Sequence, residues 1–201
     1  MNLFNKNPKI IYNNIKKLLI ESVNDRNHTF HTPVFSNITK ENKIQSRVVV
    51  LRKFDEKELK LNFHTDYRSP KIRDLLINNK SYFLFYDFKL KLQLRIETIS
   101  NINNNNKISK KAWIKTSLNS RKCYLTSKSP SSKTNIPEDG ISEHLIGISP
   151  TLKESENGFI NFAVVENKIV SIDWLYLKYS GHRRMKIKFK SKKPTYNWII
   201  P

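Results

Sequence analysis

Residues 45–54, QSRVVVLRKF, decide the fold class, because a run this rich in valine favours an extended strand. The Asp55–Glu58 tetrad that follows predicts a turn, and Leu59–His64 returns as a second strand. The two runs therefore predict a β-hairpin as the starting unit of the fold.

Side chains alternate along a strand, so the two arginines of this segment fall on opposite faces. One face carries Arg47, Val49 and Leu51, and the other carries Val48, Val50 and Arg52. An arginine at each end of so apolar a strand needs an anionic or carbonyl partner. Either both arginines reach solvent or acidic neighbours, or they bind an anionic ligand.

Outside the hairpin, the chain alternates short strands with a few helices. Further strands are predicted at 29–38, 81–88, 92–99, 159–166, 169–178 and 182–190, helices at 68–79, 109–125 and 142–148, and polar loops at 101–107 and 126–140. This order predicts a mainly β barrel or sandwich with peripheral helices. We expect one domain over residues 1–201, with an N-terminal helix at about 8–23, a barrel at about 29–190 and a docked apolar tail at 191–201.

Composition excludes several classes of function. The 201 residues hold 37 Lys and Arg against 17 Asp and Glu, a net charge of +20 that attracts anions. The lysines are spread along the chain and accompany abundant Asn and Ile, as a biased composition would produce, so no specific nucleic-acid partner is expected. Phosphate-loop, GxGxxG, GxSxG and HExxH motifs are absent. One cysteine and five scattered histidines predict no disulfide and no metal site.

No apolar stretch approaches the roughly 20 residues that cross a bilayer. The N-terminal residues also lack the continuous apolar core of a secretory signal. We therefore expect a cytoplasmic protein without membrane contact.

The segment FHTDYRSPK at 63–71 is a candidate phosphate site, because a strand ends there and a helix begins. Ser69 is placed to cap this helix and Pro70 to be its first residue. A helix start offers unpaired N–H groups and partial positive charge, and Thr65 and Lys71 stand beside it. The segment is either a glycine-free phosphate cradle or an ordinary capped helix with basic neighbours.

Two later segments carry side chains that suit a flat, conjugated anion. The amide of Gln93 can donate and accept, as the edge of a heterocycle requires. Trp174 leads through Ser180-Gly181 into His182, Arg183 and Arg184, which places a large ring near cationic side chains. The alternatives are an ordinary glutamine, a core tryptophan and a solvated basic turn.

Together, the order RVVxLR, TDxRSxK, a strand with Gln, and a late IxWLxL…GHRR ending resembles the pyridoxamine 5′-phosphate oxidase-like family, in its divergent, related branch. The resemblance implies a six-stranded antiparallel split barrel that forms a homodimer with FMN at the subunit interface. It implies that Arg47, Lys71, Ser69 and Thr65 bind the FMN phosphate and that Gln93 contacts the cofactor. Trp174 and Arg184 would come from the partner subunit. The flavin and ribityl chain would be lined by Val48, Val49, Leu51, Arg52 and His64.

The resemblance also implies an oxidoreductase in which a small-molecule substrate, a phosphorylated one among the options, passes a hydride to flavin N5. His182 and Arg52 are the candidate substrate contacts. The family's substrate-binding Arg-x-His is replaced here by Ser180-Gly181-His182, and its Tyr, Arg and Ser group aligns loosely with Tyr124, Lys128 and Ser132. Two alternatives stay open: a flavin-binding or flavin-sensing module without catalysis, and a basic nucleic-acid-binding barrel that uses the aromatic run at 81–88.

Overall fold

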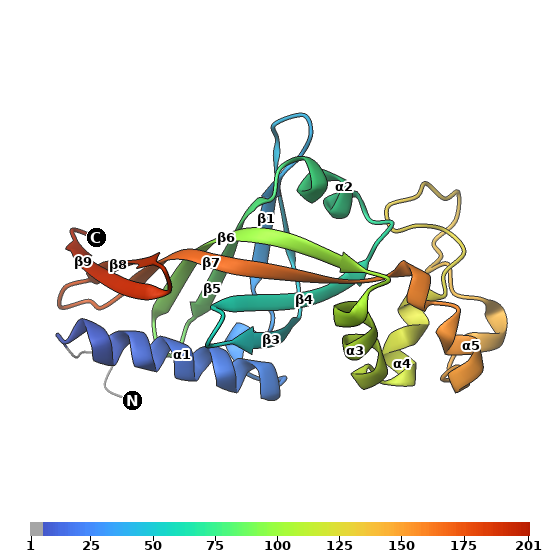
Figure 1. The fold of residues 1–201 in the computed structure, drawn as a ribbon, viewed down its shortest axis with the longest axis horizontal. Helices are drawn as coiled ribbons and strands as arrows, with labels where there is room; N and C mark the ends of the chain where they lie inside the picture. Colours follow the sequence, from blue (N-terminus) through green and yellow to red (C-terminus); the bar gives the residue numbers. More distant parts are fainter. Residues whose placement is uncertain (1–5) are drawn as a thin grey trace.

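The computed structural model describes residues 6–201, and its centre is a nine-stranded antiparallel sheet (Figure 1). The strands are β1 (Val34–Ile38), β2 (Ile44–Val48), β3 (Leu51–Asp55), β4 (Lys60–Asp66), β5 (Lys80–Asp87), β6 (Leu92–Asn104), β7 (Phe162–Tyr176), β8 (Arg183–Lys190) and β9 (Lys193–Ile199). The α-helices are α1 (Pro8–Asn24), α2 (Pro70–Ile77), α3 (Lys107–Lys115), α4 (Leu118–Arg121) and α5 (Leu152–Glu156). The predicted fold class is confirmed, although the sheet has nine strands rather than six.

The connection between β2 and β3 shows that the sheet is rolled. The strand order is β2-β1-β5-β6-β7-β4-β3, so β2 and β3 lie at its two ends. Only Val49 and Val50 join them. Three residue steps span at most about 11 Å, so the two edges of the sheet must approach each other. The prediction of one strand at 45–54 is therefore wrong, because the chain crosses from one edge to the other at these two valines.

Strand β7 is the longest and connects the two halves of the sheet. Its first half pairs with β4, its second half pairs with β8, and β6 runs beside its whole length. The prediction of two separate strands at 159–166 and 169–178 is wrong, because β7 is continuous and Asn167 is fully buried inside it. Its amide donates to the carbonyls of Leu61 and Val165, and Ser100 donates to its side-chain oxygen.

Two further segments, at 101–107 and 109–125, also differ from the sequence-based prediction. The predicted loop at 101–107 begins as strand, since β6 continues to Asn104, whose amide donates to the carbonyls of Ile160 and Phe162. The predicted helix at 109–125 breaks after α3, where Ser117 caps α4. Long-range hydrogen bonds therefore extend β6 through Asn104, whereas a local cap at Ser117 breaks the predicted helix.

The core lies inside the rolled sheet and beneath α1. Phe35, Phe63 and Phe83 are buried with ring centroids 4.8 to 6.3 Å apart. Helix α1 lies where the N-terminal helix was expected, and its apolar residues Ile11, Ile15, Leu18 and Leu19 are all buried in this cluster. No helix of the described chain has both the length and the apolar character to span a membrane.

A second, smaller core lies under α3, where Trp113 packs on Phe162 and Val164. The buried Arg121 donates to Glu156 Oε1 at 2.9 Å, and Trp113 Nε1 donates to the same oxygen at 3.0 Å. These contacts hold α3 against β7 and join α3 and α4 to Glu156 of α5, so α3 is firmly held.

Candidate functional site

The end of β4 and the start of α2 form a small basic cradle. Lys71 Nζ donates to Thr65 Oγ1 at 2.9 Å and to Ser69 Oγ at 3.2 Å. Pro70 begins α2, and the Ser69 hydroxyl makes no capping bond to the helix. The side chains that the sequence placed at a phosphate site therefore do converge.

Arg47 reaches the same cradle from β2. Its guanidinium donates to the side-chain oxygens of Asn37 and Gln45. Burial, and after it the positive charge of Arg47, lowers the pKa of Lys71 below its ordinary value. In the described part of the chain, neither cation forms an ion pair with a carboxylate. Two partly buried cations that lie close together would be stabilised by an anion.

Arg68 also lies near the start of α2, but its guanidinium is already bonded to other parts of the protein. Its guanidinium donates to both carboxylate oxygens of Asp66 and to the backbone oxygen and hydroxyl of Thr126. This bidentate pairing raises the pKa of Arg68. Arg68 therefore anchors the segment after α4 to the turn beside the cradle.

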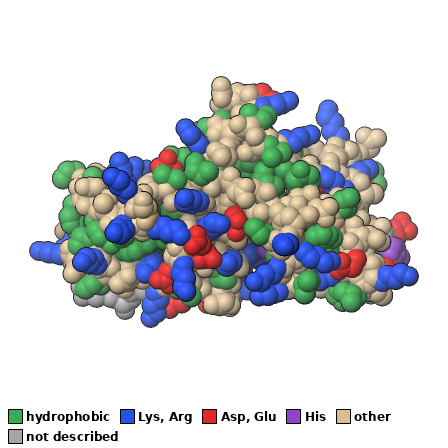
Figure 2. Space-filling model, viewed as in Figure 1, with side chains coloured by type: hydrophobic (Ala, Val, Ile, Leu, Met, Phe, Trp, Pro, Cys, Tyr) green, Lys and Arg blue, Asp and Glu red, His purple; other side chains and the backbone are tan. Residues whose placement is uncertain are grey.

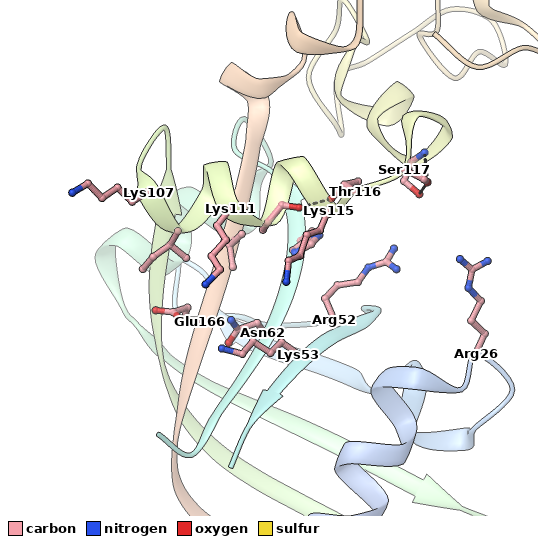
Figure 3. A pocket seen from close by; sticks show the side chains of 15 residues that line it. Arg26, Arg52, Lys53, Asn62, Lys107, Lys111, Lys115, Thr116, Ser117 and Glu166 are labelled. Carbon is pink, nitrogen blue, oxygen red and sulfur yellow. Dashed lines mark hydrogen bonds between the residues drawn. The ribbon is translucent and has the colours of Figure 1, made fainter. Parts of the chain in front are cut away.

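On the opposite face of β4, His64 lines a cavity of about 840 Å³ (Figure 3). Its ring packs against Phe162 at a centroid distance of 4.8 Å. Burial, with a smaller effect of the Arg52 charge, lowers the pKa of His64 from 6.5 to about 4. Arg52 and Asn62 line the same cavity. His64 is therefore a neutral imidazole at neutral pH, on a wall shared with a cation.

The apolar residues beside Arg47 have different environments. Val48 is 62% exposed on the outer sheet surface, whereas Leu51 is 0% exposed and its side chain is part of the core. Val49 packs partly against that core, and its amide donates to the Pro33 carbonyl. Within this chain, the Leu51 side chain therefore does not line a ligand surface. Gln93 is half-buried on β6, beside Tyr86 and Leu175 in the register.

The segment from Trp174 to Arg184 does not lie at the cradle of the same chain. Trp174 is 0% exposed, in the core beside the rings of Tyr176 and Trp198, so the structure does not support the predicted contact of its ring with a ligand. Arg184 donates to both carboxylate oxygens of Asp173. His182 lies exposed in the β7–β8 turn, and β8 lies at the end of the sheet opposite α3 (Figure 1).

Tyr124 and Lys128, which the resemblance aligned loosely with a substrate-binding group, lie in different environments. Tyr124 packs against Trp113 and Phe162, and burial raises its pKa. Lys128 instead pairs with Glu138 in the exposed segment after α4. The residues that line the cavity with Arg52 come from α3 and from α4, notably Lys111, Lys115 and Ser120. Sequence reasoning missed them, although the four-residue spacing of the lysines was visible.

A rolled antiparallel sheet with a basic cradle where a helix begins defines the class of this chain as a split-barrel fold. Residues 13–104 match the family model described as pyridoxamine 5′-phosphate oxidase, FMN-binding domain. The resemblance drawn from the sequence is thereby confirmed: over these residues the chain is similar to the FMN-binding domain of the pyridoxamine 5′-phosphate oxidase family. No curated protein sequence matches the chain.

Solved structures show the same fold over almost the whole chain. PhzG from Burkholderia lata, in complex with tetrahydrophenazine-1-carboxylic acid, is 16% identical, with a TM-score of 0.73 over 100% of this chain and 97% of that one. A pyridoxamine 5′-phosphate oxidase-related, FMN-binding protein from Nostoc punctiforme is 15% identical, with a TM-score of 0.71 over 94% of this chain and 97% of that one. At these identities the similarity defines the fold.

Proposed function

We propose that this protein is a cytoplasmic flavoprotein that binds FMN through the cradle and acts as an oxidoreductase. The observation that carries this proposal is the convergence of Arg47, Lys71, Thr65 and Ser69 in a chain that matches an FMN-binding family model. Two cations and two hydroxyls at a helix start are the donor set that a phosphate monoester requires.

The electrostatics of the cradle fit a phosphate. Among residues 6–201, Lys71 donates only to neutral hydroxyls and Arg47 only to amide oxygens, so no ion pair within this part of the chain occupies either charge. The Arg47 charge disfavours the protonated form of Lys71, and a phosphate dianion between them would reverse that effect. Binding should therefore raise the pKa of Lys71.

Bound FMN would supply hydride acceptance at flavin N5, and the chain would supply placement and charge. Arg52 and the neutral His64, on one cavity wall, are the residues we assign to the flavin and substrate side. Within one chain, His182 lies in the β7–β8 turn, far from the cavity. We therefore assign His182 of a second subunit to substrate contact.

We also propose a homodimer that uses the outer face of the sheet. Alternate residues of β5 point outward, and Tyr82, Leu84 and Tyr86 are 51%, 39% and 49% exposed. Val48 extends this apolar surface across β1 and β2, and Gln93 and Arg184 border it on β6 and β8. A second copy would cover these side chains and bring residues from β7 and β8 toward the partner's flavin site.

An FMN titration of the purified protein tests the cradle. Lys71→Ala should weaken FMN binding by roughly 10- to 150-fold, because one charge-assisted hydrogen bond contributes about 1.5–3 kcal/mol. Lys192→Ala removes a charge of the same sign from an exposed turn, where it pairs with Glu58, and is the control. Equal losses in the two variants would contradict the cradle.

The replacement of an Arg-x-His pair by Ser180-Gly181-His182 favours a second candidate, a flavin-binding module without catalysis. Turnover assays with pyridoxamine 5′-phosphate, reduced nicotinamide cofactors and dyes distinguish the two. A yellow protein with no turnover on any of them would support the non-catalytic module.

A further inference from the structure

We infer that the cavity between α3 and the β3–β4 hairpin binds a small organic polyanion with at least two separate anionic groups. This inference deepens the proposed function, and rests on it only for the position of the ligand beside the flavin. The basis is a row of lysines on α3 at positions 107, 111 and 115, all of which line the cavity. A four-residue spacing keeps them on one helix face, with a span of about 12 Å at 1.5 Å per residue.

The facing wall is also cationic. Arg52 and Lys53 come from β3, and Arg26 follows the end of α1. Figure 3 shows Lys111 and Lys115 extending from α3 toward the wall that carries Arg52, Lys53 and Asn62. Lysine and arginine on two opposed walls define a slot that an elongated anion enters between them.

These charges are hardly compensated inside the protein. Across residues 6–201, Lys53 alone among the six cations of the cavity is in an ion pair, with Asp55 at 2.9 Å. The one acidic residue of the lining, Glu166, already pairs with Lys60 at 3.3 Å. Facing like charges repel, so this arrangement costs stability and favours a ligand of opposite sign.

A buried polar atom on the same wall adds a second requirement. Asn62 lines the cavity and is 5% exposed, and its side-chain Oδ1 has no hydrogen-bond partner in the described structure. A buried acceptor of this kind needs a donor, such as a ligand hydroxyl or amino group. Its side chain points into the space between the two basic walls (Figure 3).

Size and chemistry together define the ligand class. A cavity of about 840 Å³ is within the range that encloses a ligand of cofactor size rather than an extended polymer. Lysine ammonium groups act as point charges that suit phosphate or carboxylate oxygens. We therefore assign the cavity to an oligophosphate or polycarboxylate that also carries a hydroxyl or amino group, and not to a nucleic-acid strand.

The test is a calorimetric titration of the full chain with inorganic tripolyphosphate, with and without saturating FMN. The Lys111→Gln, Lys115→Gln double variant should bind tripolyphosphate at least about tenfold more weakly than wild type. The control is the Lys17→Gln, Lys133→Gln double variant, which loses the same charge at exposed sites outside the cavity lining. Thermal unfolding of each variant confirms that it is folded.

A similar loss in both double variants would overturn the inference, because generic surface charge would then explain binding. It would also be overturned if a short single-stranded oligonucleotide bound more tightly than tripolyphosphate and depended on the same two lysines. Lysine-dependent tripolyphosphate binding by a protein that takes up no FMN would support the cavity and refute the flavin site. FMN binding without lysine-dependent tripolyphosphate binding would support the flavin site and refute the assignment of the cavity.

Discussion

The environment of His64 predicts how stability changes with pH. The pKa of His64 is lowered from 6.5 to about 4, by burial and by Arg52. Between these values the unfolded chain binds a proton that the folded chain excludes, so the free energy of unfolding falls as the pH falls. At about 1.4 kcal/mol per tenfold change in proton affinity, the full effect is about 3 kcal/mol. About 2 kcal/mol of it is lost between pH 7 and pH 5.

The measurement is urea unfolding at pH 7 and pH 5, for wild type and for His64→Gln. Glutamine keeps a polar side chain of comparable size at the cavity wall but does not titrate. Carboxylates titrate in both proteins and cancel in the comparison, so wild type should lose about 2 kcal/mol more than the variant. The same loss in both proteins would refute the account of His64 as a neutral, enclosed imidazole.

Three further substitutions test other parts of the structure. Leu84→Glu, on the exposed face of β5, should convert a dimer to a monomer in sedimentation experiments, and a persistent dimer would refute the proposed interface. Trp113→Ala should lower the free energy of unfolding by about 3–5 kcal/mol, as measured in urea, because the ring is fully buried. Arg121→Ala should cost about 2 kcal/mol in the same assay, since Glu156 is 40% exposed and water can replace the lost partner.

Local patterns were sufficient to predict the elements whose ends depend on local chemistry. The apolar face of α1 and the alternation of β5 follow directly from residue spacing, and both agree with the structure. The cradle was predictable for the same reason, since Thr65, Ser69 and Lys71 lie within seven consecutive positions around one helix start. Only Arg47 had to be brought there by the tertiary fold.

The errors fall where distant partners satisfy polar groups. Asn167 looks like a turn residue, yet it is buried in β7 because Ser100 and two backbone carbonyls bond its side chain. Trp174 looks like a ligand-stacking ring, yet the strand places it in the core beside Trp198 from β9. Single-sequence patterns do not contain these long-range contacts, so neither position was predictable from spacing alone.

The two proposed anion sites depend on the alternation of a single strand. Along β4, Leu61 and Phe63 point into the core and Thr65 continues that side to the cradle, whereas Asn62 and His64 point into the cavity. A shift of one residue in the pairing of β4 with β7 would exchange these faces and would bury Asn62 and His64 in the core. The register that stabilises the barrel is therefore the same feature that separates the proposed phosphate cradle from the basic cavity.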